Sequence, residues 1–106
     1  NYKSELLNAD SGSTKLMLKS HVPVRLLKNK FYRELEKMEE NCASKEELIE
    51  HLGHGRAKLG MLDGDIEDGE LEIGQICALI KTIPTVEEMV NELKEQYENT
   101  ILQFRE

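Results

Sequence analysis

The end of the chain carries the feature that most constrains its fold, a long stripe of apolar residues at helical spacing. The stripe recurs every three or four residues through Val86, Met89, Val90, Leu93, Tyr97, Ile101 and Phe104. This spacing predicts an amphipathic helix of about five turns, and Thr85-Val86-Glu87-Glu88 at its start is a capping-box pattern. A face this broad needs a surface to cover it, and a chain of 106 residues offers mainly its own shorter helices.

The rest of the chain predicts shorter helices, so we expect a mostly α fold with about five helices and at most one short strand. Residues 2–9 form a first helix, which the turn-forming residues 10–13 end. Residues 14–22 alternate weakly between apolar and basic side chains and favour an extended segment. Pro23 suits the first position of a longer helix that ends near Asn41. Its apolar stripe is Val24, Leu27, Phe31, Leu35 and Met38.

Two further helices and a loop are expected in the second half. Ser44-Lys45-Glu46-Glu47 is a capping box that begins a short helix, and Gly53 ends it. Residues 54–62 predict a short helix or an irregular turn, and the acidic, glycine-rich residues 63–69 predict a loop. Ile73, Ile76, Cys77 and Ile80 then mark one more helical face before Pro84.

Charge is divided unevenly along the chain, whose formal net charge is −7. Residues 1–60 carry a small positive excess, with a net charge of +2, whereas residues 61–106 have a net charge of −9. Six basic residues and no acidic one lie between Ser11 and Arg33: Lys15, Lys19, Arg25, Lys28, Lys30 and Arg33. Such a segment attracts phosphate ligands, or it faces the acidic part of the same protein. We favour the second interpretation.

The sequence contains no self-sufficient catalytic or metal-binding motif. It has no P-loop, GxGxxG, GxSxG or HExxH pattern. His51 and His54 have a spacing that can share a metal, but with Cys42 they fall short of the four ligands of a structural zinc. Residues 63–69 resemble a calcium loop yet place Asp68 where an EF-hand requires glycine. We therefore expect no metal site.

The two cysteines, Cys42 and Cys77, are too few for a disulfide scaffold, and we expect reduced thiols in a cytoplasmic protein. No apolar run approaches the ~20 residues of a membrane span, and the start lacks a signal-peptide pattern. We expect neither membrane nor nucleic-acid partners. Because the sequence begins at Asn1 rather than Met, we also expect an excised domain or a fragment.

Gly74-Gln75 is the one local pattern that hints at a ligand. A glycine in the first turn of a helix costs roughly 1 kcal/mol relative to alanine, so another backbone or a ligand is expected to approach closely there. The glutamine side chain can both donate and accept hydrogen bonds. From spacing alone, we favour a glycine that lets two segments pack closely.

Several segments together resemble one enzyme family. They are Pro23-Val24-Arg25-Leu26-Leu27-Lys28-Asn29, His54-Gly55-Arg56-Ala57-Lys58, Gly64-Asp65-Ile66-Glu67-Asp68-Gly69 and Gly74-Gln75-Ile76-Cys77-Ala78-Leu79-Ile80. In this order and spacing they resemble the C-terminal signature of nitronate monooxygenases, formerly 2-nitropropane dioxygenases. Enoyl-acyl-carrier-protein reductase II has a similar run. The resemblance covers nearly the whole chain.

The resemblance implies a (β/α)8 barrel that binds FMN and accepts hydride from NADH or NADPH. Such a barrel needs about 250 residues, so this chain would be a C-terminal fragment, without bound flavin and inactive alone. Residues 1–69 would be an inserted helical lid on the substrate side. Residues 70–106 would be helices that return to the barrel, whose missing N-terminal part would be the partner.

The resemblance also assigns the candidate site residues. Gly74 and Gln75 would line the flavin and substrate pocket, and Arg25 would contact a phosphate of the nicotinamide cofactor. The family's catalytic histidine matches no histidine here, so no catalytic residue is expected in this chain. Glu70 and Glu72 stand where the reductase pattern has Ser and Met, which favours the broader class of NAD(P)H-dependent flavin oxidoreductases.

A second interpretation from another class needs no enzyme. An acidic helical interaction module without catalysis would show the same amphipathic stripes. The two interpretations differ in whether about 200 residues with flavin-binding loops precede this chain. If the chain is cut from a barrel, its exposed apolar faces favour association, and we expect a homodimer or an exchanged packing of the fragment.

Overall fold

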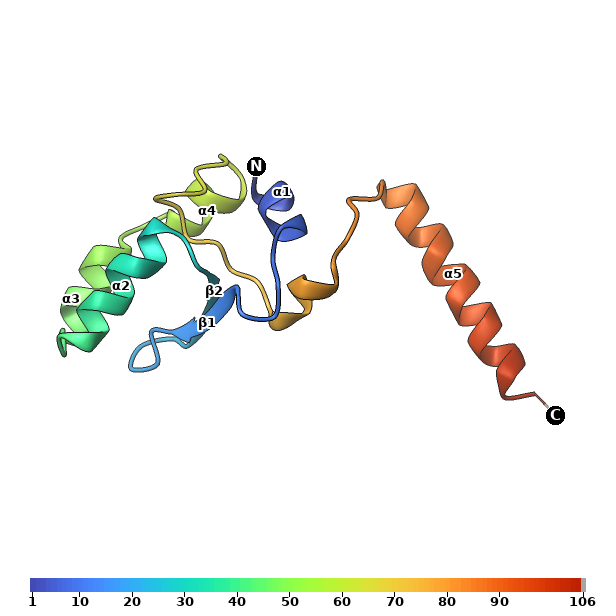
Figure 1. Ribbon diagram of the computed structural model, residues 1–106, viewed down its shortest axis with the longest axis horizontal. Helices are drawn as coiled ribbons and strands as arrows, with labels where there is room; N and C mark the ends of the chain where they lie inside the picture. Colours follow the sequence, from blue (N-terminus) through green and yellow to red (C-terminus); the bar gives the residue numbers. More distant parts are fainter. Residues whose placement is uncertain (106) are drawn as a thin grey trace.

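The computed structural model describes residues 1–105 of the chain, which form five α-helices, one 3-10 helix and two short strands (Figure 1). The helices are α1 (Tyr2–Leu7), α2 (Lys30–Glu40), α3 (Lys45–Leu52), α4 (Arg56–Met61), η1 (Gln75–Leu79) and α5 (Val86–Gln103). The strands are β1 (Thr14–Met17) and β2 (Val24–Leu27). The predicted mostly α fold with five helices is therefore confirmed.

The strands correct one prediction, because the segment after Pro23 is a strand rather than the first turn of a helix. β2 pairs antiparallel with β1, with Met17 opposite Val24 and Thr14 opposite Leu27. The expected limit of one strand was therefore wrong. Two apolar residues three apart fit a helix and a short strand equally well, and here the neighbouring β1 supplies the hydrogen-bonding partner that a strand requires.

Helix α2 begins instead at Lys30, where Asn29 supplies the cap. The Asn29 side chain accepts a hydrogen bond from the backbone N–H of Tyr32, at 2.9 Å. From there the predicted stripe is correct, because Phe31 and Leu35 are buried and Met38 packs at the edge of the same cluster. The two predicted capping boxes, at the starts of α3 and α5, are both present.

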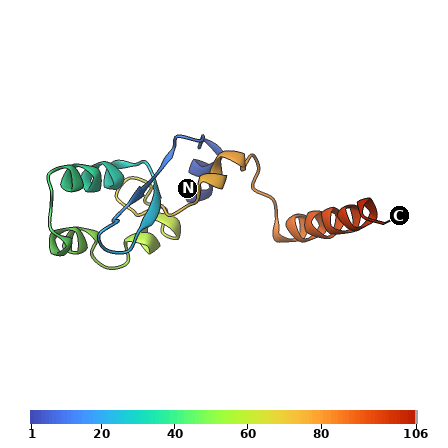
Figure 2. The ribbon, with the colours of Figure 1, turned by 90° about the horizontal axis from the view of Figure 1, so that it is seen from below.

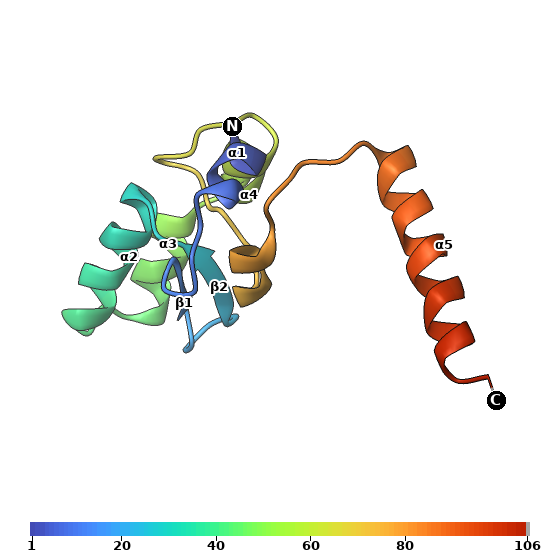
Figure 3. The same ribbon diagram turned by 45° about the vertical axis from the view of Figure 1, so that its right-hand side comes forward.

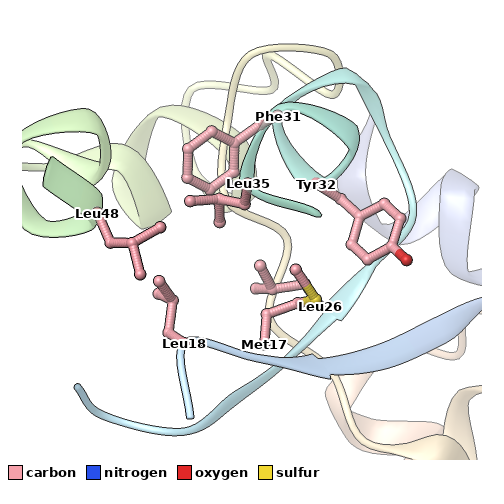
Figure 4. Close-up of a cluster of buried hydrophobic side chains, with 7 residues drawn as sticks. All are labelled: Met17, Leu18, Leu26, Phe31, Tyr32, Leu35 and Leu48. Carbon is pink, nitrogen blue, oxygen red and sulfur yellow. The ribbon is translucent and has the colours of Figure 1, made fainter. Parts of the chain in front are cut away.

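Two clusters of buried apolar side chains hold residues 1–80 together. The first lies between the β-hairpin, α2 and α3, as Figure 4 shows. Its buried members are Met17, Leu18, Leu26, Phe31, Tyr32, Leu35 and Leu48. The second joins α1 to η1 through Leu6, Ala9, Leu27, Leu71 and Cys77. Adjacent residues of β2, Leu26 and Leu27, enter different clusters because neighbouring side chains of a strand point to opposite faces.

The predicted boundary between residues 69 and 70 does not separate two packed bodies in the described chain. The backbone N–H of Leu27 donates to the carbonyl of Leu71 at 2.9 Å. The hydroxyl of Tyr2 donates to the carbonyl of Glu72 at 2.6 Å. Residues 70–80 thus pack against residues 1–69. The division into a lid of residues 1–69 and returning helices of residues 70–106 stays a prediction.

Helix α5 projects away from the rest of the chain, at the end of the extended residues 81–84 (Figures 1, 2 and 3). Within the described residues it buries none of its side chains. The predicted stripe is present but open, with Leu93 59% exposed and Tyr97 68% exposed. No helix in residues 1–105 has the length and apolar content needed to cross a membrane.

Candidate functional site

Residues 71–75 run beside β2 and carry the predicted site residues to the surface. Leu26 and Glu72 form an antiparallel bridge, and the N–H of Ile73 donates to the carbonyl of Arg25 at 3.2 Å. This pairing holds the segment in place up to Gly74, where η1 begins. The backbone of Arg25 is therefore hydrogen-bonded to Ile73, the residue directly before Gly74-Gln75.

Gly74 and Gln75 are both exposed, at the point where η1 leaves the sheet edge. Gly74 has φ −74° and ψ 168°, a conformation open to any residue. A Cβ at Gly74 would have only the Ile76 Cγ2 atom within 4 Å, at 3.9 Å. Close packing between segments of residues 1–105 therefore does not explain this glycine, and the surface above it is free to receive another group.

The exposed side of η1 is apolar. Ile76 and Leu79 are 62% and 71% exposed, whereas Cys77 on the opposite side is fully buried in the second cluster. The site residues therefore lie on a surface that apolar contacts would stabilise if a further group covered it.

Arg25 lies half-buried in β2, and its side chain reaches along the hairpin. Its guanidinium Nη1 donates to the Thr14 hydroxyl at 3.2 Å. Among residues 1–105 no carboxylate forms an ion pair with Arg25, unlike several of its basic neighbours. Lys30 pairs with Asp68 at 2.6 Å and Arg33 with Glu67 at 4.0 Å. These two pairs join Lys30 and Arg33 of the basic segment to the acidic loop of the same protein.

The histidines and cysteines lie apart from one another. His51 stacks on Phe31 with a centroid distance of 5.6 Å and lies 3.3 Å from a Glu34 carboxylate oxygen. His54 is exposed beyond the end of α3. Cys42 is exposed and Cys77 buried, and both are free thiols, as expected. Within residues 1–105 no cluster of three or more potential metal ligands is present.

Asn29 is a structural residue of the family-like segments whose role the sequence did not reveal. It is 8% exposed, and its amide donates to the carbonyls of Ile66 and Gly69 at 2.9 and 2.8 Å. Because its oxygen also caps α2, one side chain joins the start of that helix to the loop before the candidate site. An asparagine just before the apolar residues of a helix is a sequence signal for an N-cap. This signal was not used, because the helix was expected to begin at Pro23.

Arg56 is a second such residue, at the start of α4. Its guanidinium donates to three backbone carbonyls, of His51 at 2.9 Å, Leu52 at 3.2 Å and Asp68 at 3.1 Å. Its central carbon also lies 4.8 Å from the centre of the Phe31 ring. Arg56 thus ties the end of α3 to the acidic loop and is fully engaged inside the fold.

Glu70 and Glu72, the two acidic departures from the reductase pattern, line one pocket of about 280 Å³. Glu70 is only 7% exposed, whereas Glu72 is exposed. Burial raises the pKa of the Glu70 carboxyl, and the nearby Glu72 raises it further, against a smaller lowering by Arg56. The pocket opens beside the turn between β1 and β2.

The chain is similar to one protein family and to solved structures of one enzyme. The family profile described as nitronate monooxygenase matches residues 2–96. Among solved structures, FabK from Thermotoga maritima is similar over 98% of this chain, at 26% identity and a TM-score of 0.79. A mutant of FabK from Thermotoga maritima shares the fold over 98% of the chain, at 24% identity and a TM-score of 0.73. No curated protein sequence matches the chain.

The chain spans about a third of the length of these structures, covering 33% of the first and 30% of the second. The matched portion nevertheless includes every family-like segment, from Pro23 to Ile80, in the order in which they occur in the sequence. Because the family profile covers most of the chain, this protein belongs to the nitronate monooxygenase family.

Proposed function

We propose that this chain is the C-terminal part of an FMN-dependent NAD(P)H oxidoreductase, and that a (β/α)8 barrel formed by the rest of that enzyme covers its open apolar faces. The observation that carries the proposal is the exposed surface around Gly74-Gln75. Ile76 and Leu79 beside it, and the whole stripe of α5, face solvent. Contiguous apolar surface of this kind marks an interface, and the family membership supports a flavin enzyme as its owner.

Gly74 and Gln75 fit one wall of a flavin and substrate pocket. The space next to Gly74 is open, with only the Ile76 Cγ2 atom within 4 Å of an added Cβ, and the exposed Gln75 amide can donate to one polar atom and accept from another. When bound, FMN would supply the hydride transfer chemistry. This chain would contribute orientation through Gln75 and exclusion of water through the apolar side chains of η1.

Arg25 is proposed to meet a phosphate of the nicotinamide cofactor. Its guanidinium forms one described hydrogen bond, to Thr14, and leaves further donors free. A planar guanidinium can bind two phosphate oxygens at once. Residues 1–69 would then act as a lid beside the barrel mouth, and residues 70–106 would return to the barrel. Glu106, the last of these, lies outside the described residues.

The full-length protein tests this proposal. It is expected to carry an FMN absorbance spectrum and to oxidise NADH or NADPH. Gln75→Ala is expected to lower kcat, and Arg25→Ala is expected to raise KM for NAD(P)H with little change in kcat. Lys19→Ala, which removes an exposed charge from the same basic segment, is the matched control for Arg25 and is expected to leave KM unchanged.

The 106-residue chain alone is proposed to bind no flavin and to associate through its exposed faces. Sedimentation and absorbance of the isolated chain measure both properties. A longer protein without flavin-binding capacity would favour the alternative, an acidic helical interaction module with no catalysis. Wild-type kinetics in the Gln75 variant would remove that residue from the site.

A further inference from the structure

The pocket lined by Glu70 and Glu72 is distinct from the surface around Gly74 and lies between the β1–β2 turn, the end of α3 and residues 70–72. Its walls are largely apolar, formed by Leu18, Val22, Pro23, Val24 and Leu52. Leu18 also belongs to the first buried cluster (Figure 4), so the pocket adjoins the packed core. Its volume of about 280 Å³ is close to the lower end of the ~300–1,000 Å³ typical of small-molecule sites.

Two acidic side chains line this pocket, and neither forms an ion pair within residues 1–105. Glu70 is 7% exposed, and within residues 1–105 no hydrogen bond or ion pair reaches its carboxylate. Glu72 adds a second carboxylate, and His21 is the one further ionisable side chain that lines the pocket. No lysine or arginine is among the lining residues.

Arg56, the cation whose charge acts on Glu70, lowers the pKa of that carboxyl only in part and forms no ion pair or hydrogen bond with it. Its guanidinium nitrogens donate to the carbonyls of His51, Leu52 and Asp68. A carboxylate on a mostly buried residue, facing a largely apolar pocket without an ion-pair partner, is costly, and proteins normally supply a partner or keep such a group protonated. Burial and Glu72 both raise the pKa of Glu70, which agrees with a carboxylate that lacks a cation.

We propose that this pocket binds a small organic cation, a protonated primary amine carried on an apolar body. The ammonium group would lie between the carboxylates of Glu70 and Glu72, where three N–H donors can each reach an oxygen. The alkyl body would pack on Leu18, Val24 and Leu52. This site goes beyond the oxidoreductase proposal and does not depend on flavin binding.

Other ligand classes fit the lining less well. Two carboxylates repel phosphates and carboxylic acids, so an anion is disfavoured. A neutral ligand would bury its apolar body equally well but would leave the Glu70 charge unpaired. Within the part of the chain that the structure describes, these residues do not form a cluster able to hold a metal ion. A cation with an apolar body would pack against the apolar walls and pair with the carboxylates.

The test is a methyl NMR titration of the full-length protein, labelled on leucine and valine, with n-pentylammonium as the probe. The signals of Leu18, Val24 and Leu52 are expected to shift and to saturate. The neutral probe n-pentanol is expected to bind at least tenfold more weakly. Glu70→Gln, which keeps the side-chain shape, is expected to weaken the amine at least tenfold. Glu72→Gln is expected to weaken it less, because that side chain is exposed.

The matched control is Glu40→Gln, the same change on an exposed residue at the end of α2, which is expected to leave amine affinity unchanged. Three results would each overturn the proposal: no saturable shift at these methyl groups, equal affinity for the alcohol, or unchanged affinity in the Glu70 variant. A lysine side chain from the rest of the protein that fills the pocket would give the first result. Titrations of the Glu72 variant keep the test valid if the Glu70 variant is poorly folded.

Discussion

Residues 1–80 and helix α5 obtain their structure in opposite ways. The first region has modest local helix signals, since its helices are short, but it holds two buried clusters and the side chains of Asn29 and Arg56 tie its loops to its helices. α5 has the longest apolar stripe and a complete capping box, yet none of its described residues is buried. Capping and periodicity therefore define a helix, whereas long-range contacts decide whether it belongs to a packed core.

The largest expected effect is at the crossing of α4 and the acidic loop in residues 1–80. Gly69→Ala would place a Cβ 2.2 Å from the Gly60 Cα and 2.4 Å from the Asp65 carbonyl oxygen. Because backbone atoms on both sides block the added methyl, the free energy of unfolding is expected to fall by about 3 kcal/mol or more. Urea denaturation measures the loss.

Gly12→Ala is the matched control for this substitution, since its Cβ would meet only an Asp10 carboxylate oxygen, at 3.4 Å. The change is expected to alter the free energy of unfolding by less than about 1 kcal/mol. Equal effects of the two substitutions would show that the crossing at Gly60 and Gly69 does not hold the packed region together.

The next largest effect is expected at Asn29. Asn29→Ala removes the cap of α2 and leaves the carbonyls of Ile66 and Gly69 without their donor. Loss of a cap costs about 1 kcal/mol, and each buried group left unpaired costs a further ~1–3 kcal/mol before relaxation. We expect a loss of about 2–3 kcal/mol in urea denaturation. Asn41→Ala, at an exposed position, is the control and is expected to change stability by less than about 0.5 kcal/mol.

Glu70→Gln is expected to stabilise residues 1–80 at neutral pH, by about 1 kcal/mol, because it removes a buried charge without a partner. Burial raises the pKa of Glu70 in the folded protein above its ordinary value of 4.5. The native state therefore holds this proton more tightly than the unfolded state, and the ionised carboxylate destabilises the fold above the raised pKa. The gain from Gln is expected to shrink as pH falls through that pKa and to vanish below about 4.5. A gain that persists in acid would contradict this origin.

Much of the local structure was predictable from the sequence, and the reasons for the errors are physical. Capping boxes and stripes act within a few residues, so α3, α5 and the buried face of α2 were predicted correctly. The start of α2 was not, because only the pairing of β2 with β1 distinguishes a strand from a helical turn at Val24. The pocket brings Glu70 and Glu72 beside residues 18–24, about 50 positions earlier in the chain, and no local pattern encodes that contact.

The candidate site divides in the same way. The resemblance implied that Gly74 and Gln75 line a ligand pocket, and both lie on an exposed surface, but any ligand contacts that they make stay a proposal. Asn29, Arg56 and Gly69 lie in the family-like segments as well, and in this structure they serve the fold. The family-like segments therefore contain residues that build the scaffold as well as those proposed to face a ligand, and only three-dimensional contacts identify the former.

The smallest expected effect is in α5, and it tests directly whether the rest of the protein covers this helix. In the 106-residue chain, Leu93→Ala is expected to change the free energy of unfolding by less than about 0.5 kcal/mol, because Leu93 is 59% exposed. Leu35→Ala, the same substitution at a fully buried position of α2, is expected to cost about 2–5 kcal/mol. In the full-length protein the Leu93 substitution is expected to cost about 2 kcal/mol, since the barrel would cover the stripe.

A large effect of Leu93→Ala in the 106-residue chain that grows with protein concentration would mean that a second copy already covers α5. The absence of any effect in the full-length protein would mean that the barrel does not cover it.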